Sequence, residues 1–290
     1  MRTSGDGTGN GRARCESVRV SELSVAVVVT CFNYGRFLGE AVDSVLAQTV
    51  SASRIVVVDD GSTDDTKAVA TGYGAQLTYI WKPNGGPGSA RNAGIDELAR
   101  VSPPPAYVIF LDADDTLVPN YIERCLSANT TGKADTIIYN QLRFTGENSG
   151  VSTYPHFSLD ALKRANIIHV SALIPFKALD RRRFEPTLRP HGLEDWDLYL
   201  GLAEDGVRGV LVDEPLLVYR RHEHAISHSL VSNPWRLARL RWRLLVRHRR
   251  LYGSLGFVRQ ALSVVADLWN DVDFVPRLRR AASRRLRPER

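Results

Sequence analysis

Short apolar runs alternate with segments of helical periodicity along the first half of the chain. Val25 to Thr30 is a continuous apolar run of strand length, and the apolar pairs that follow it recur every four residues, as on one face of a helix. Similar runs predict strands at Ile55 to Val58, Leu77 to Trp81 and Tyr107 to Leu111. A Gly/Pro loop precedes a predicted helix from Ser89 to about Ala99. This alternation predicts an α/β fold, with a mostly parallel sheet flanked by helices.

The pattern changes after Asp115, where the periodicity is less regular and element boundaries are weak. From Trp235 to about Tyr252 a helical segment carries arginines on one stripe, with leucines beside it. Residues 1–22, rich in Gly, Ser and Arg, predict a disordered tail, and residues 233–290 predict a basic helical C-terminal extension. We therefore expect one main domain over residues 23–232.

The composition is that of a globular chain of enzyme size. With 290 residues and 43% hydrophobic content, the chain can bury one sizeable core without disulfides. Its three cysteines form no C-x-x-C pair and their odd number argues against a disulfide framework, so a reducing cytoplasm is the expected location. No stretch of the sequence approaches the roughly 18 apolar residues of a membrane span. The net charge of +6 fits nucleotide phosphates, nucleic acid or a lipid surface, and does not choose among them.

Polar residues follow the predicted strands, and ligands bind beyond the carboxyl ends of strands in an open parallel sheet. A D-x-D pattern occurs three times, at Asp112/Asp114, at residues 195/197 and at residues 271/273. Only the first directly follows an apolar strand, where two alternate carboxylates can face a ligand pocket. Such hard oxygen ligands suit Mg²⁺ or Mn²⁺, whereas the simpler interpretation is an acidic surface turn. The chain lacks the dinucleotide-binding G-x-G-x-x-G and the phosphate-binding G-x-x-x-x-G-K-[ST] motifs.

Several longer motifs occur in a fixed order. They are T-C-F-N-Y-G-R-F-L at 30–38, V-V-V-D-D-G-S-T-D-D-T at 56–66, N-G-G-P-G-S-A-R-N-A-G at 84–94, F-L-D-A-D-D at 110–115, L-E-D-W-D-L at 193–198 and Y-R-R-H-E-H-A-I-S at 219–227. In this order and spacing the sequence resembles glycosyltransferase family 2, which has the GT-A nucleotide-sugar-binding fold. The resemblance covers roughly residues 24–228. It implies a nucleotide-sugar-binding half at 23–116 and an acceptor half at 117–232.

The resemblance also implies an activity and a donor site. The activity is inverting transfer of a sugar from a nucleoside diphosphate, expected to be UDP, to an acceptor hydroxyl. Thr30, Phe32 and Asn33 would line the nucleotide pocket, Asp60 would hydrogen-bond the base or ribose, and Arg91 would lie near the diphosphate. An ionised Asp60 can accept hydrogen bonds from uracil N3 and ribose hydroxyls. Two simpler interpretations stay open, a helix-capping turn around Asp60 and plain packing for Phe32.

The triplet Asp112-Ala113-Asp114 is the expected metal and diphosphate site. By the resemblance, Asp112 would contact the ribose or a metal-bound water, and Asp114 would coordinate the Mn²⁺ or Mg²⁺ that bridges the phosphates. His222 is the implied third ligand, with His224 as the competing choice. Such a cation acts as a Lewis acid on the departing nucleoside diphosphate.

Asp195 is the candidate general base. An acceptor hydroxyl has a pKa far above neutral, so a positioned carboxylate must take its proton. Asp195 matches the aspartate of the family's ED motif, with Trp196 beside it as a candidate apolar wall against a sugar face. The alternative is that Asp195 and its acidic neighbours are charges at a helix N-terminus, stabilised by the macrodipole.

Two further questions stay open in the sequence. The segment 235–252 could dock on anionic lipid as a basic amphipathic helix, which would make the protein peripheral at the inner face of the membrane, but a packed helix is favoured. Rival functions are a sugar-nucleotide nucleotidyltransferase and a non-catalytic binding protein. Nucleic acid is not an expected partner, because the basic residues gather at the tail without interleaved aromatics. The donor sugar and the acceptor, whether glycan, lipid-linked sugar or small molecule, are left undefined.

Overall fold

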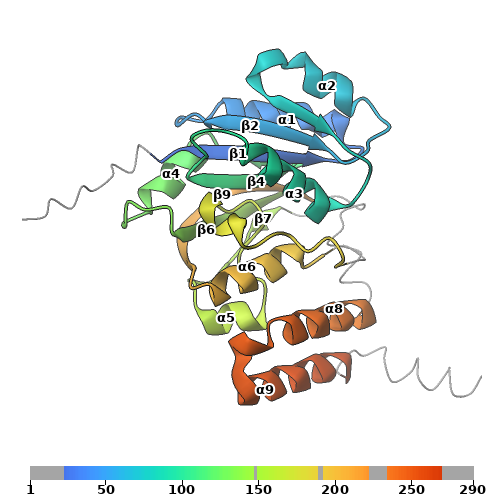
Figure 1. The fold of residues 1–290 in the computed structure, drawn as a ribbon, viewed down its shortest axis with the longest axis vertical. Helices are drawn as coiled ribbons and strands as arrows, with labels where there is room; N and C mark the ends of the chain where they lie inside the picture. The colour runs from blue at the N-terminus through green and yellow to red at the C-terminus, as the bar shows by residue number, and fades with distance from the viewer. Residues whose placement is uncertain (1–22, 147–148, 189–191, 222–233, 270–290) are drawn as a thin grey trace, which may run out of the picture.

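The computed structural model describes residues 23–146, 149–188, 192–221 and 234–269 (Figure 1). Its main sheet has the strand order β3-β2-β1-β4-β8. The parallel strands begin and end within one residue of the predicted positions, which confirms them. They are β1 (Val25–Cys31), β2 (Arg54–Asp59), β3 (Thr78–Trp81) and β4 (Tyr107–Asp112), with the short antiparallel β8 (Ile174–Pro175) at the edge.

Both faces of the main sheet are buried, which explains why its strands are continuous apolar runs rather than alternating ones. Along β1, Ala26 and Val28 belong to one core cluster, whereas Val27 and Val29 belong to another. The first cluster includes residues of α3 (Pro87–Leu98), and the second includes residues of α1 (Gly35–Leu46). The two helices therefore cover opposite faces of the sheet, and the predicted α/β fold is confirmed.

The helix α3 begins two residues before its predicted start, because Pro87 is tolerated in the first turn of a helix. It lies directly on β1 at Gly94. A Cβ atom built at Gly94 would come within 2.4 Å of a methyl carbon of Val28, so this contact requires glycine. The remaining elements of this half are α2 (Thr66–Gly72), the 3₁₀ helix η2 (Gly74–Gln76) and α4 (Tyr121–Ser127).

The strand order reverses its direction at β1, because β2 lies on one side of it and β4 on the other. In open α/β sheets, the crevice at such a switch point is where ligands bind. The register places Cys31 beside Asp59 and Thr30 beside Asp112. The predicted polar strand ends therefore meet at one edge of the sheet.

A second sheet, with the order β5-β9-β6-β7, lies beside the first. Its two long strands, β6 (Thr136–Gly146) and β9 (Arg208–Arg221), run parallel, with register shifts around Gln141. The shifts break the simple alternation of side chains, which explains why no regular strand pattern is visible in this part of the sequence. The other elements are β5 (Thr116–Leu117), β7 (Gly150–Val151), α5 (Leu159–Arg164), η3 (Phe176–Asp180) and α6 (Glu194–Glu204).

The C-terminal helices α8 (Pro234–Arg247) and α9 (Arg249–Trp269) form a hairpin at one end of the molecule (Figure 1). On α8, Leu240 and Leu244 are buried in the same core cluster as α3 and α6, which confirms packing for this face of the segment. No described helix is long and apolar enough to cross a membrane. The predicted domain boundary at 22/23 lies where the described part begins, and the one at 232/233 lies outside it. Both stay predictions, as does the division at 116/117.

Candidate active site

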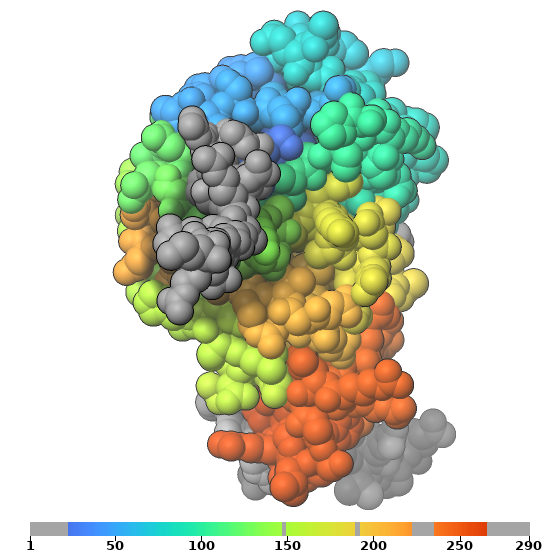
Figure 2. Space-filling view, turned by 60° about the vertical axis from the view of Figure 1, so that its left-hand side comes forward, coloured from blue at the N-terminus to red at the C-terminus, as the bar shows by residue number. Residues whose placement is uncertain are grey.

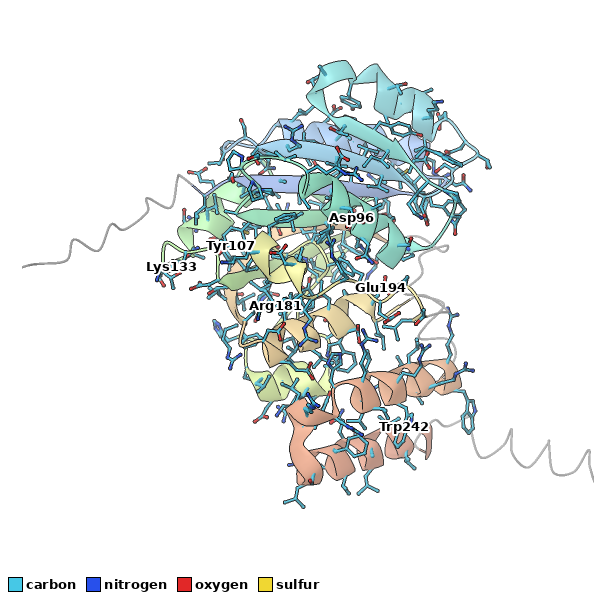
Figure 3. The ribbon with its side chains drawn as sticks, in the orientation of Figure 1. Asp96, Tyr107, Lys133, Arg181, Glu194 and Trp242 are labelled. Atoms are coloured by element: carbon cyan, nitrogen blue, oxygen red, sulfur yellow. The ribbon has the colours of Figure 1, made fainter. Side chains whose placement is uncertain are left out.

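A cleft of about 1220 Å³ opens between the carboxyl ends of the main-sheet strands and the second sheet. In Figure 3, Tyr107 marks the amino end of β4, and Glu194, at the start of α6, lies toward the carboxyl end of that strand. His222 and His224 lie outside the described residues. The other predicted site residues all line this cleft: Thr30, Phe32, Asn33, Asp60, Arg91, Asp112, Ala113, Asp114 and Asp195.

The cleft has two walls of different origin. The first wall is made by the loops that follow the strands of the main sheet, at residues 30–36, 60–65, 84–91 and 112–115. The second wall comes from β6, β9, the segment 166–171 and residues 192–195 at the start of α6.

In the first wall, Asn33 ties the loop after β1 to the loop after β2. Its backbone N–H donates to the Ser62 hydroxyl at 2.9 Å, and its side-chain oxygen accepts from the Thr63 backbone N–H at 2.8 Å. Asn33 has a φ of 56°, a conformation that asparagine tolerates better than most residues. The neighbouring Phe32 is 46% exposed in the cleft, so plain core packing does not explain it.

Asp60 holds the 84–88 loop at the floor of the first wall. Its Oδ1 accepts from Lys82 Nζ at 2.5 Å and from the Gly85 backbone N–H at 2.9 Å, and its Oδ2 accepts from the Gly86 backbone N–H at 2.7 Å. Each carboxylate oxygen offers about two acceptor positions, and the described residues use only one of those on Oδ2. The other position suits a single donor such as the N–H of a base.

The alternative of a helix-capping turn does not describe Asp60. The α2 helix begins later, at Thr66, and its N-cap residue Asp65 makes no capping hydrogen bond with its side chain. Asp59 instead closes the turn after β2, accepting from the Ser62 backbone N–H at 2.7 Å. The role of Asp60 toward a nucleotide stays a prediction.

The triplet after β4 gathers carboxylates at the switch point of the sheet. Asp112 Oδ1 accepts from the Thr30 hydroxyl at 3.0 Å, whereas Asp115 is buried and accepts from the Arg220 backbone N–H at 3.0 Å. Burial raises the pKa of Asp115 well above its usual value, and the charges of Asp114 and Asp112 raise it further. A cation between these carboxylates would relieve their repulsion.

The donor set fits a hard divalent cation. Asp112 and Asp114 both line the cleft, and no described residue donates a hydrogen bond to Asp112 Oδ2. Among the described residues, no group of three or more His, Cys, Asp or Glu side chains could hold a metal. Mg²⁺ commonly binds one or two protein carboxylates and completes its shell with substrate phosphates, so a two-carboxylate set is chemically sufficient.

Arg91 connects the two walls. It is 4% exposed, and its guanidinium donates to Asp112 Oδ1 at 2.9 Å and to Glu194 Oε1 at 3.0 Å. The Phe184 ring lies against the same group, 5.4 Å from its central carbon. Burial lowers the pKa of Arg91, but Asp112 and Glu194 more than compensate and raise it above its usual value. The sequence placed Arg91 near the diphosphate, and this bridge to Glu194 was missed because the partners are far apart in the chain.

Asp195 lies in the second wall, and its surroundings raise the pKa of its carboxyl group. Its Oδ2 accepts from the Asn166 amide at 2.8 Å and its Oδ1 from the Trp196 backbone N–H at 2.8 Å. Burial raises its pKa to about 6, with the Glu194 charge as the next cause. A carboxyl group with this pKa is ionised at neutral pH and still accepts a proton readily.

Local backbone strain accompanies the start of α6. Leu193, at its N-cap, has a φ of 72°, which costs energy for a branched side chain and needs support from its surroundings. The proposed sugar-facing role of Trp196 is wrong. Trp196 is 5% exposed, and its indole N–H donates to the Leu162 carbonyl at 2.7 Å, so it faces the core. Acidic residues do occupy the first turn of α6, so the macrodipole interpretation describes their position as well.

The second wall contains residues that no motif indicated. Asn166, His169 and Ser171 line the cleft, and each carries one buried polar atom without a hydrogen-bond partner among the described residues. Burial lowers the pKa of His169 to about 3, so this imidazole is neutral. Tyr154 stands beside it, with ring centroids 6.0 Å apart. A lone histidine or asparagine in an irregular segment gives no sequence signal for such a position.

Comparisons with known proteins agree with this architecture. The family model described as glycosyl transferase family 2 matches residues 26–189. An uncharacterized glycosyltransferase of Rickettsia felis is 32% identical over 223 residues, which are 72% of this chain and 36% of that protein. The chondroitin synthase of Pasteurella multocida is 28% identical over 194 residues, or 63% of this chain and 19% of that one. The chain thus spans about a third or less of the length of these relatives.

Two solved structures resemble the fold. Residues 1–349 of Staphylococcus aureus TarS, in complex with UDP-GlcNAc, match with a TM-score of 0.66 at 16% identity, covering 87% of this chain and 74% of that one. The mannosyltransferase PcManGT of Pyrobaculum calidifontis, in complex with GDP-Man and Mn²⁺, matches with a TM-score of 0.57 at 16% identity, covering 92% and 82%. The family match covers more than half of the chain, and the predicted resemblance is confirmed: the chain belongs to glycosyl transferase family 2 and has the GT-A fold.

Proposed function

We propose that this chain transfers a sugar from a nucleoside diphosphate donor to an acceptor hydroxyl with inversion at the anomeric carbon. One observation carries the proposal. Arg91 links Asp112, at the switch point of the sheet, to Glu194 and so to the adjacent Asp195. This link supports a scheme in which the proposed diphosphate site and the proposed base lie on opposite walls of one cleft, as transfer between two bound substrates requires.

UDP is the expected nucleotide. The remaining acceptor position on Asp60 Oδ2 suits the single N3–H donor of uracil, and Phe32 offers an exposed ring in the same wall. The TarS match with UDP-GlcNAc supports this choice, whereas the PcManGT match with GDP-Man shows that the fold also serves guanine nucleotides. A test must therefore include both.

Asp114 and Asp112 are the residues that would hold Mn²⁺ or Mg²⁺ together with the donor diphosphate. When bound there, the cation supplies Lewis-acid stabilisation to the leaving diphosphate. The Mn²⁺ in the matching PcManGT structure supports a divalent ion. His222, or His224 in its place, completes the proposed set.

Asp195 is the proposed general base. Its pKa of about 6 leaves it ionised at pH 7, and the Asn166 amide holds its Oδ2 in place while a lone pair remains for the acceptor proton. A single displacement needs one base and no covalent nucleophile, which is the reason for expecting inversion. The acceptor lies on the side of the second wall in this scheme.

The decisive experiment measures nucleoside diphosphate release from UDP-GlcNAc, UDP-glucose, UDP-galactose and GDP-mannose with Mn²⁺. We expect one donor to be hydrolysed slowly without acceptor. Asp114→Ala should reduce that turnover by at least about 10³-fold, since several kcal/mol of leaving-group stabilisation are lost. Asp195→Asn should keep donor binding, measured by calorimetry, and lose transfer. Asp135→Asn, an exposed carboxylate remote from the cleft, is the matched control.

Three outcomes would overturn the proposal. Full turnover in excess chelator would exclude the metal role. Release of pyrophosphate from a nucleoside triphosphate and a sugar phosphate would identify a nucleotidyltransferase. Tight donor binding without turnover in the wild-type protein, for every acceptor tried, would indicate a non-catalytic binding protein.

A further inference from the structure

The outer face of α9 exposes four aliphatic side chains. Leu255 is 88% exposed, Val258 55%, Leu262 65% and Val265 56%. At 100° per residue, they fall within an arc of roughly 80° on the helix, so they form one stripe. We call these four residues the α9 apolar surface. Aliphatic side chains grouped and exposed in this way mark an interaction site more often than isolated ones do.

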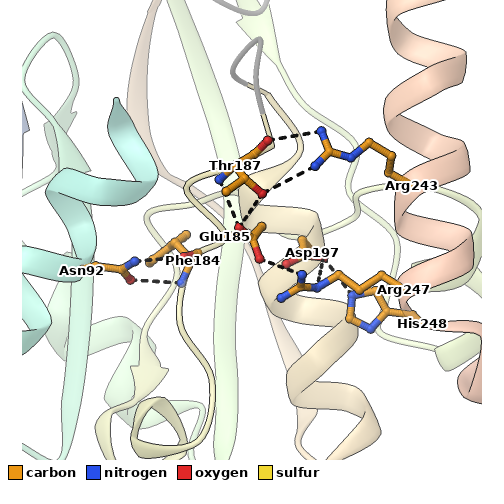
Figure 4. A network of polar contacts seen from close by, with 8 residues as sticks. All are labelled: Asn92, Phe184, Glu185, Thr187, Asp197, Arg243, Arg247 and His248. Atoms are coloured by element: carbon orange, nitrogen blue, oxygen red, sulfur yellow. Dashed lines mark hydrogen bonds and ion pairs between the residues drawn. The ribbon is translucent and has the colours of Figure 1, made fainter. Parts of the chain in front are cut away.

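The hairpin that carries this surface is fixed to the domain. Figure 4 shows His248 and Arg247 reaching Asp197 on α6, at 3.0 and 3.1 Å, while the Arg243 guanidinium donates to the Thr187 carbonyl at 3.2 Å. His248 is only 2% exposed. Because these contacts anchor α8, the α9 apolar surface does not belong to a loosely attached helix.

The described part of the domain does not cover this surface. In Figure 1, α8 lies between α9 and the rest of the molecule, and Figure 2 shows the hairpin, in red, at the end opposite α2. The inner face of α9 packs on α8, where Phe257 meets Trp242 with ring centroids 6.2 Å apart. Trp242 is labelled in Figure 3. The outer face therefore has no neighbour among the described elements of the chain.

The charge of the C-terminal hairpin favours an anionic occupant for the α9 apolar surface. Residues 234–269 contain eight arginines and a single acidic residue, Asp267. Five of these arginines are exposed. Arg247 is paired with Glu185 and Asp197, and the other four are Arg239, Arg249, Arg250 and Arg259. Arg259 lies about 40° from Leu255 on the helix, at the edge of the stripe. A second copy of the hairpin would bring like charges together, which disfavours self-association.

We propose that the α9 apolar surface docks on an anionic lipid bilayer. The four aliphatic side chains enter the boundary between headgroups and acyl chains, and the exposed arginines contact lipid phosphates, as in other basic amphipathic helices. Aliphatic side chains gain nothing from a nucleic acid, whose contacts are phosphates, base edges and stacked aromatics. The surface thus differs from the segment 235–252, whose buried residues pack on the domain.

The test uses the full chain and sedimentation with vesicles of phosphatidylcholine, alone or with 30% phosphatidylglycerol. We expect binding to the anionic vesicles, weakened at least about tenfold by the double substitution Leu255→Ser and Leu262→Ser, since two buried aliphatic groups are lost. The matched control is Leu46→Ser with Val151→Ser, exposed aliphatic residues elsewhere on the chain, which should leave binding unchanged. Arg259→Gln should weaken binding less and reduce its salt dependence.

Each other outcome contradicts the proposal. Equal loss in the control pair, or no loss in the α9 pair, would exclude the α9 apolar surface as the contact. Loss only in Trp235→Ser with Trp242→Ser would assign docking to the α8 segment. A concentration-dependent dimer that Leu255→Ser and Leu262→Ser dissociate, seen by analytical ultracentrifugation, would identify a second copy as the occupant. Donor hydrolysis should stay at the wild-type rate in the α9 pair, which separates this proposal from the proposed activity.

Discussion

The two walls of the cleft are built in different ways. In the first wall, Asp60 pairs with the Gly85 and Gly86 backbone N–H groups, and Arg91 Nε is the one buried side-chain nitrogen or oxygen without a hydrogen-bond partner among the described residues. In the second wall, Asn166, His169 and Ser171 each keep a buried polar atom that no described residue satisfies. Buried polar atoms are almost always paired in native proteins, so the second wall needs ligand or water to complete it.

This difference matches the proposed division of labour. A nucleoside diphosphate is the same ligand in every turnover, so the first wall gains from being preorganised. The second wall would meet the acceptor, and its incomplete pairing leaves hydrogen-bond capacity for it. Arg91 links the two walls through Asp112 on one side and Glu194 on the other, and the Arg220 backbone N–H, which donates to Asp115, is a second link.

Removing the Arg91 bridge between Asp112 and Glu194 should have the largest effect on the free energy of unfolding. Arg91→Met keeps the size of the side chain but leaves Asp112 and Glu194 without their cation. Removing one partner of a buried ion pair costs about 3–5 kcal/mol, so the free energy of unfolding should fall by that amount. Urea denaturation followed by circular dichroism measures it. Arg100→Met, which breaks an exposed i,i+3 pair with Glu97, should cost under about 0.5 kcal/mol.

A neutral outcome for Arg91→Met would mean that the walls hold each other without the bridge. In that case backbone packing would position Asp112 and Glu194, and Arg91 would not be needed to hold them in place.

Substitution in the first wall should have an intermediate effect. Asp60→Asn replaces one acceptor oxygen with an amide donor. At least one of the three groups that donate to Asp60 then loses its acceptor; these are Lys82 Nζ and the backbone N–H groups of Gly85 and Gly86. The unfolding free energy should fall by about 1–3 kcal/mol, and the affinity for UDP by about tenfold, because the loop is less well ordered. Calorimetric titration with UDP gives the affinity. Equal affinity in Asp60→Asn would show that the first wall is not preorganised through this residue.

The smallest effect is expected for a substitution in the second wall, where Asn166→Ala should change the pKa of Asp195 and lower kcat. Asn166→Ala removes the hydrogen bond that lowers the pKa of Asp195, so this pKa should rise above about 6. Because the base must be ionised, the rate falls as the pH drops through that pKa, and this limb of the pH–rate profile should move to higher pH. At pH 7 we expect kcat about tenfold lower, a part of what general-base catalysis contributes.

The control for Asn166→Ala is Gln76→Ala, which removes an amide from an exposed residue. Asn166→Ser, which restores a donor, should recover part of the shift. A lower kcat with an unmoved pH profile would mean that Asn166 acts on the fold rather than on Asp195.

The first half of the fold could be predicted from the sequence because its signals are local. A parallel strand such as Val25–Cys31 is buried at every position and apolar at every position except Thr30, and each strand end is marked by polar residues. The spacing of the motifs therefore placed Asp60 and Asp112 at one edge of the sheet without tertiary information. The sequence indicated a helix N-terminus near Asp195 only as the alternative interpretation, and α6 begins at Glu194.

The rest depends on contacts between distant residues. Arg91 and Glu194 are 103 positions apart, so neither sequence neighbourhood shows that the guanidinium is buried between carboxylates. Trp196 adjoins Asp195 in sequence, but successive helical side chains point in different directions, which sends Trp196 to the core. Asn166 and His169 reach the cleft from an irregular segment that has no period.

The sequence by itself determined the α/β fold, its family and which residues gather at the strand ends, because apolar periodicity and motif spacing are properties of neighbouring residues. Only the tertiary structure decided which carboxylates share the Arg91 guanidinium, which wall has buried polar atoms without partners, and which face of the C-terminal hairpin is exposed. Those outcomes follow from burial and from the pairing of charges across the cleft, and such terms are set by the three-dimensional packing of the chain.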